Sequence, residues 1–85
     1  MRRKVVYSKH ALDQMVERGT CKEEVEEAIF KGEKIPAKKD RHTYRLNFQF
    51  DESWGEKWYH MKQVMPVVKE ETNELIVITV YVFYF

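Results

Sequence analysis

Three polar side chains near the amino terminus have the four-residue spacing of one helix face: His10, Gln14 and Arg18. A histidine can transfer protons near neutral pH, and an arginine can hold a phosphate through paired hydrogen bonds. These groups could cleave RNA without a metal ion, with the imidazole as base and the guanidinium stabilising the transition state. The polar margin of an ordinary amphipathic helix has the same spacing, with Arg18 balancing the helix dipole. The spacing alone leaves both interpretations open.

A second group of candidate residues comes from the predicted strands of the carboxyl-terminal half. Alternation along these strands predicts one polar and aromatic sheet face that carries Arg45, Asn47, Trp58, His60, Lys62, Thr79 and Tyr81. Cations that contact phosphates and rings that stack on bases favour single-stranded RNA binding. Acid, base and charge-stabilising groups for cleavage would also be present there, although a solvated sheet face has a similar composition. A one-residue slip in register would reverse the faces of any of these strands.

Two helices should precede the strands. Ser8 is a good N-cap and Gly19 a good helix stop, so the first helix lies between them. Thr20 and Glu23 have the spacing of a capping box for the second helix, which Gly32 would end. Helical spacing predicts buried faces made of Leu12, Met15 and Val16 in the first helix and of Val25, Ala28 and Ile29 in the second.

The remaining residues predict a small sheet. A short strand is expected at Lys4–Tyr7, a linker at 33–40, a strand at 43–50 and a loop at 51–56. A strand bent at Pro66 follows at 57–69, then a turn at 70–73 and a final strand at 75–85. The residues expected to face the core are Tyr59, Met61, Ile76, Ile78, Val80 and Val82. We therefore predict an α+β fold in which two N-terminal helices pack on a small antiparallel sheet of three to four strands.

Composition limits the classes of function. The 85 residues are enough for one domain, residues 1–85, and 44% hydrophobic residues with a net charge of +1 exclude a disordered or strongly basic chain. A single cysteine, Cys21, and three dispersed histidines give no metal-binding spacing, so we expect neither a metal nor a cofactor. The single cysteine and the lack of an apolar leader or membrane segment favour a cytoplasmic protein.

Several motifs resemble one prokaryotic family, domain-of-unknown-function family four-two-five-eight. They are Ser8-x-His10-Ala11-Leu12-x-Gln14-Met15-x-x-Arg18-Gly19, Val25-Glu26-Glu27-Ala28-Ile29 and Val77-Ile78-Thr79-Val80-Tyr81. That family is similar to RelE/ParE-like and BrnT-like toxins and, more widely, to the barnase–EndoU–colicin–RelE ribonucleases. The resemblance implies a RelE-like fold and active positions at His10, Arg18, Thr79 and Tyr81, with Arg45 as a basic strand residue. Gln14 stands where the family usually has arginine, which removes one cation from that site.

Two hypotheses of function follow. The first is a toxin-like, metal-independent ribonuclease of a toxin–antitoxin system, whose partners would be RNA or the ribosome and an antitoxin protein. The second is a non-catalytic protein-binding or RNA-binding module. In that case the long aromatic strand that ends in Val80–Phe85 would offer an open edge to a partner or to a second copy as a homodimer.

Overall fold

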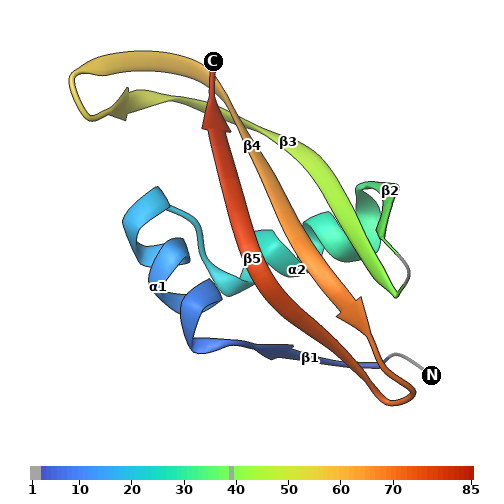
Figure 1. Cartoon of the computed structure of the whole chain (residues 1–85). Coiled ribbons are helices and arrows are strands. Elements are labelled where there is room, and N and C mark those ends of the chain that lie inside the picture. Colours follow the sequence, from blue (N-terminus) through green and yellow to red (C-terminus); the bar gives the residue numbers. More distant parts are fainter. Residues whose placement is uncertain (1–2, 39) are drawn as a thin grey trace.

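The computed structural model describes residues 3–38 and 40–85 and has one five-stranded sheet with two helices (Figure 1). Its elements are β1 (Lys4–Tyr7), α1 (Lys9–Arg18), α2 (Lys22–Lys31), β2 (Glu33–Lys38), β3 (Arg41–Trp54), β4 (Lys57–Glu70) and β5 (Glu74–Tyr84). The strand order is β1-β5-β4-β3-β2. β1 runs parallel to β5, while every other neighbouring pair is antiparallel.

The sheet corrects the predicted fold class, because it has five strands and is mixed rather than three to four strands and purely antiparallel. Two short edge strands account for the difference. β1 adds to β5 in parallel, and the segment expected to be a linker forms β2 against β3. Pro36 misled the prediction, since a proline is compatible with an edge strand, where no further ladder needs its missing N–H.

The long hairpin of β3 and β4 also extends further than expected. Asp51 to Trp54, predicted as loop, belong to β3, and a bulge between Gln49 and Glu52 lets this part pair with the start of β4. Asp51 has a positive φ of 48° in that bulge, a conformation that aspartate tolerates better than most residues. Only Gly55 and Glu56 form the turn. The predicted strand with Pro66 is confirmed as β4, where Pro66 is buried opposite Val80.

The helix boundaries follow the predicted signals in all but one place. Ser8 caps α1, since its side chain accepts a hydrogen bond of 3.0 Å from the backbone N–H of Ala11, and Gly19 ends it with φ 79°. The capping box was wrong. Cys21 is the N-cap of α2 and makes no side-chain capping bond, while Thr20 Oγ1 donates to Glu24 Oε1 at 2.8 Å.

The buried face of α1 is rotated from the predicted one. Val16 is 82% exposed and Leu12 is also exposed, whereas Gln14 is 8% exposed and lies with Ala11 and Met15 against the sheet. The helix therefore buries a polar side chain in place of two apolar ones. The reason lies in the backbone of β5, which needs a hydrogen-bonding partner at this position. The predicted face of α2 is confirmed, because Val25, Ala28 and Ile29 are all buried.

Both helices lie on the same side of the sheet, with α1 beside β5 and α2 across β4 and β3 (Figure 1). The core lies between these layers. Its strand residues are Tyr44, Val64, Val68, Leu75, Val77 and Val80. The buried residues of β4 are Lys62, Val64, Pro66 and Val68. Their positions alternate along the strand with those of Tyr59 and Met61, so the predicted face was wrong by one residue.

In β5 an irregularity opposite Val67 and Val68 shifts the alternation, so Leu75 and Val77 replace the predicted Ile76 and Ile78 in the core. Such a bulge adds one residue to one strand of the pair, so the inward-facing positions differ by one residue on its two sides. Beyond it, Val80 is fully buried and Val82 packs against the core, as predicted.

A cluster of rings packs on the end of α1. Tyr84 lies 5.1 Å from both Phe50 and Trp54 between ring centroids, and the Trp54 ring stacks on it at 15°. The Tyr84 hydroxyl donates to the Arg18 carbonyl at 2.6 Å. Gly19 leaves the space for this packing, because an added Cβ would lie 2.6 Å from both Trp54 and Tyr84 side-chain atoms.

Gly19→Ala should destabilise the protein more than Gly55→Ala. Both positions have a positive φ, of 79° and 66°, so each alanine pays a left-handed backbone penalty of about 1–2 kcal/mol. Only Gly19 is also crowded by side chains, whereas a Cβ at Gly55 meets nothing within 4 Å. We expect an additional loss of about 1–3 kcal/mol for Gly19→Ala, measured by urea denaturation. Equal losses for the two variants would contradict this account of the ring cluster.

Candidate nucleic-acid interface

Side chains of α1 cover the part of the β5 edge that β1 leaves open. β1 pairs with β5 only as far as Val77, where the Ser8 N–H donates to the Val77 carbonyl at 3.0 Å. Ser8 Oγ then donates to the Ile78 carbonyl at 3.1 Å. One step further, Gln14 Oε1 accepts from the Val80 N–H at 2.9 Å and Arg18 Nη1 donates to the Val80 carbonyl at 2.7 Å. The helix thus supplies the hydrogen bonds that a neighbouring strand would have made.

The predicted row of His10, Gln14 and Arg18 therefore divides into two parts. Gln14 and Arg18 point to the sheet edge, where they satisfy both backbone groups of Val80. His10 is exposed in the first turn of the helix, about 12 Å from Arg18 along the helix axis. The Arg18 guanidinium is therefore held at the β5 edge, while His10 lies about two helical turns away at an exposed position.

Three of the predicted site residues do come together at the edge of β5. The Arg18 guanidinium carbon lies 5.4 Å from the centre of the Tyr81 ring, a distance typical of a cation–π contact. Thr79 lies two residues before Tyr81, on the same face of the strand. Arg45 is on β3, two strands and about 10 Å away, where it forms an ion pair with Glu33.

The side of the sheet that faces away from the helices is called the open face below. Alternation and strand pairing place on its central part Arg45, Asn47, Gln63, Met65, Val67, Lys69, Thr79, Tyr81 and Phe83. Tyr81 and Phe83 are 43% and 48% exposed, with their rings 6.4 Å apart and nearly parallel at 15°. A hydrogen bond of 2.9 Å from Gln63 to Asn47 crosses the face. The acidic Glu33 lies beside this set on β2, opposite Arg45, with which it forms an ion pair.

Lys62 does not belong to the open face, which corrects its predicted position. It is 7% exposed and points to the helix side, where Nζ donates to the Gly19 carbonyl at 3.0 Å and pairs with Glu24 at 2.7 Å. A buried ammonium needs such partners to balance its desolvation. Trp58 and His60 lie near the tip of the β3–β4 hairpin, where their rings contact each other and His60 lies 3.2 Å from Asp51.

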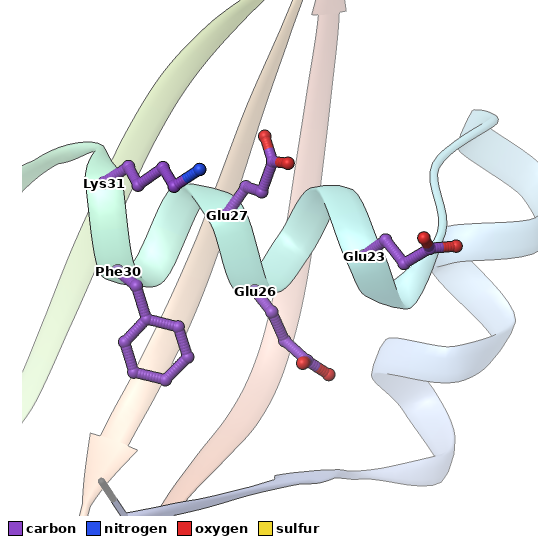
Figure 2. Close-up of a pocket in the computed structure, with 5 residues that line it drawn as sticks. All are labelled: Glu23, Glu26, Glu27, Phe30 and Lys31. Carbon is purple, nitrogen blue, oxygen red and sulfur yellow. The ribbon is translucent and has the colours of Figure 1, made fainter.

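The outer surface of α2 is acidic. A shallow hollow there is lined by Glu23, Glu26, Glu27, Phe30 and Lys31, all from the same helix (Figure 2). Glu26 accepts a hydrogen bond of 2.6 Å from the Tyr7 hydroxyl, and burial together with this carboxylate raises the pKa of Tyr7. Carboxylates repel phosphates, so a nucleic acid is disfavoured on the helix side and not on the open face.

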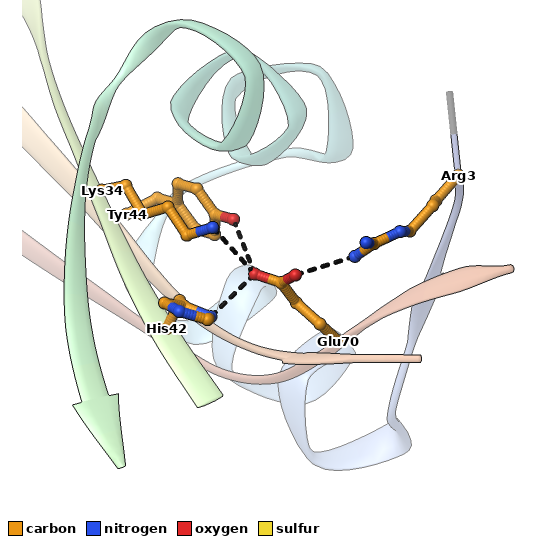
Figure 3. A network of polar contacts seen from close by, with 5 residues as sticks. All are labelled: Arg3, Lys34, His42, Tyr44 and Glu70. Atoms are coloured by element: carbon orange, nitrogen blue, oxygen red, sulfur yellow. Dashed lines mark hydrogen bonds and ion pairs between the residues drawn. The ribbon is translucent and has the colours of Figure 1, made fainter. Parts of the chain in front are cut away.

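A network around Glu70 was not predicted from the sequence (Figure 3). Its carboxylate pairs with Arg3 at 2.8 Å and with Lys34 at 3.1 Å, and Tyr44 donates to it at 3.4 Å. His42 Nδ1 lies 2.7 Å away but is not aligned as a hydrogen bond. These cations lower the pKa of Glu70 from 4.5 to about 2. The largest effect comes from the hydrogen bond with the Arg3 guanidinium, and Lys34 and His42 add to it. The network joins the N-terminal segment to β2, β3 and β4.

In residues 3–38 and 40–85, no three histidine, cysteine or acidic side chains gather as a set of metal ligands. Neither helix of residues 3–38 and 40–85 is long and apolar enough to cross a membrane.

Comparison with known proteins gives one match. The family described as Domain of unknown function (DUF4258) matches residues 7–82. This range includes α1, α2, β2, β3 and β4 and nearly all of β5. Neither the curated proteins nor the solved structures contain a significant match.

The Glu70 network should make stability depend on acid. Because the folded-state pKa of Glu70 is lowered, its ion pairs stabilise the protein above about pH 4.5 and this contribution is lost as the pH falls toward 2. Glu70→Gln should lower the urea midpoint at neutral pH and reduce its further fall at about pH 3. The matched control is Glu71→Gln, at an exposed neighbouring position. An unchanged acid dependence in Glu70→Gln would contradict the prediction.

Proposed function

The chain belongs to the DUF4258 family, and we propose that it is a toxin-like, RNA-directed domain that binds single-stranded RNA on its open face. The observation that carries this proposal is the exposed pair of Tyr81 and Phe83 on a sheet surface that also carries the cations Arg45 and Lys69. Stacking rings combined with cations are the usual means of holding single-stranded nucleic acid.

The ring geometry suits unpaired bases. Tyr81 and Phe83 are nearly parallel and lie side by side along β5, so each presents a face on which one base can stack. Arg18 borders Tyr81 at the edge of the sheet, and Lys69 and Arg45 lie on the neighbouring strands β4 and β3. The bases would therefore stack over β5, while the phosphates reach the cations on either side. A duplex would not offer its base faces to these rings.

The distribution of charge agrees with this placement. The net charge is only +1, but the acidic side chains of α2 are on the opposite side of the sheet. Arg45 is already paired with Glu33, so it supplies less positive field than a free arginine. We therefore expect weak, strongly stacking-dependent binding in place of the high affinity of a basic protein.

Tyr81→Ala and Phe83→Ala should each weaken the binding of a fluorescein-labelled single-stranded RNA by about 1–3 kcal/mol, the usual contribution of one stacked base. Fluorescence anisotropy at low salt would measure the change. Trp58→Ala is the matched control, because Trp58 is 53% exposed but lies at the hairpin tip. Equal binding by all three variants would contradict the assignment to the open face.

Metal-independent RNA cleavage is a second candidate function, as in a ribonuclease toxin of a toxin–antitoxin system. The contact of Arg18 with Tyr81, beside Thr79, is the observation that favours it. A tyrosine hydroxyl can act as a general acid or base, and a guanidinium can stabilise the charge that develops on phosphorus-bound oxygens. His10 lies about two helical turns from Arg18, so Tyr81 is the proton donor or acceptor that directly contacts the guanidinium. RNA, alone or on the ribosome, would be the substrate, and an antitoxin protein the inhibitor.

If the protein is a ribonuclease, its expression should arrest growth, and the purified protein should cleave RNA, free or on ribosomes, in the presence of EDTA. Tyr81→Phe should abolish cleavage but keep most RNA binding, because the ring remains while the hydroxyl is lost. Val16→Ala, at an exposed position on α1, is the control.

His10→Ala separates two mechanisms. Loss of cleavage in this variant would assign proton transfer to the imidazole, and retained cleavage would assign it to Tyr81. If the wild type causes no growth arrest and does not cleave RNA, the ribonuclease hypothesis is excluded. The RNA-binding proposal then depends on its own test.

A further inference from the structure

The backbone of β5 is satisfied on one side along its whole length. Phe85 and Met61 exchange both backbone hydrogen bonds, at 2.8 and 3.1 Å, and Phe83, Tyr81 and Thr79 continue the same pairing with β4. In an antiparallel ladder, the residues between these direct their N–H and C=O groups to the other side. Even-numbered residues of this part of β5 therefore present their backbone to the outer edge, as the bonds of Val80 to Gln14 and Arg18 demonstrate.

Val82 and Tyr84 are the next two residues of this edge. Helix α1 ends at Arg18, whose side chain reaches back only to Val80, and β1 ends further away at Tyr7. No residue in 3–38 or 40–85 makes a hydrogen bond to the outward N–H and C=O groups of Val82 and Tyr84. The edge is thus open over a short segment whose limit on one side is fixed by the side chains of α1.

We propose that this segment pairs with the same segment of a second copy of the chain, as an antiparallel strand pair around a two-fold axis. Val82 would lie opposite Tyr84 of the second copy, and Tyr84 opposite Val82, each pair exchanging both backbone hydrogen bonds. A register shifted toward Val80 is blocked, because its N–H and C=O are already bonded and α1 occupies that place. The open segment can therefore pair with its copy in only this register, which is centred on Phe83.

In this register Phe83 lies opposite Phe83 of the second copy, at the two-fold axis on the open face. Residues of such a pair have their side chains close together, which favours aromatic contact. Phe83 is 48% exposed in the single chain, so it has surface to bury. Residues 81–85 carry no charged side chain, and two copies would meet there without repulsion. The result would be one continuous sheet twice as wide, with both open faces on the same side.

The mass of the protein in solution tests this pairing. Light scattering and analytical ultracentrifugation at about 10 and 100 μM should find a dimer in exchange with the monomer. Val82→Pro removes the outward N–H and leaves the pairing with β4 intact, since proline is tolerated where the N–H faces an edge. Phe83→Lys places two like charges opposite each other and should raise the dissociation constant at least about tenfold. Trp58→Lys is the control, and its mass should equal that of the wild type.

A cross-link gives an independent readout if Val82→Pro fails to fold. In a Cys21→Ser background, Phe83→Cys should form a disulfide-linked dimer on mild oxidation, because the Cα atoms of such a pair lie about 4.5 Å apart. Trp58→Cys should not. A monomeric wild type at the higher concentration would overturn the proposal, as would a dimer that keeps its mass in both Phe83→Lys and Val82→Pro. A wild type that stays monomeric but binds a strand of another protein at Val82 would also overturn the proposal, because the partner of this edge would then not be a second copy. RNA affinity is measured separately, so failure here leaves the proposed function standing.

Discussion

The fold depends on how helix α1 satisfies the backbone of β5 at Val80. β1 is too short to cover that edge, and a buried N–H and C=O without partners would be strongly destabilising. Gln14 and Arg18 supply both hydrogen bonds from one face of the helix. This constraint fixes how far α1 lies along β5 and how it is rotated. It also explains why a glutamine is buried while Val16 is in solvent.

The same constraint changes the meaning of the polar row that suggests catalysis. Four-residue spacing is what a helix needs to line an active site, but also what it needs to follow the edge of a strand. In this protein the second use accounts for Gln14 and for the backbone bond of Arg18. Chemistry can still involve the other side of the Arg18 guanidinium, which contacts Tyr81. His10 is exposed and does not take part in these hydrogen bonds to the edge of β5.

The sequence could predict what depends on neighbouring residues. The cap at Ser8, the stop at Gly19 and the position of Tyr81 on the open face need only local conformation and strand alternation. Predictions failed where the position of a residue depends on partners that are distant in the sequence. Lys62 is buried because Glu24 and the Gly19 carbonyl receive its charge, and nothing in the alternation of β4 reveals them. The Glu70 network, β2 and the parallel pairing of β1 likewise arise from contacts between segments far apart in the chain.

Capping by side chains also determines where the sheet can still interact. A full-length neighbouring strand would have closed the β5 edge and widened the sheet beyond Tyr81. The side chains of Gln14 and Arg18 instead satisfy only the backbone of Val80 and leave the following residues of the edge unpaired. Tyr81 lies at this limit, with its ring on the open face against Arg18 and the free backbone of Val82 beside it. Face and edge therefore meet at one residue of the strand. Pairing at the edge would use the backbone groups of Val82 and Tyr84, whereas stacking of RNA would use the rings of Tyr81 and Phe83. Phe83 would contact the second copy as well as a base, so the proposed pairing leaves Tyr81 as the ring that remains fully available to RNA.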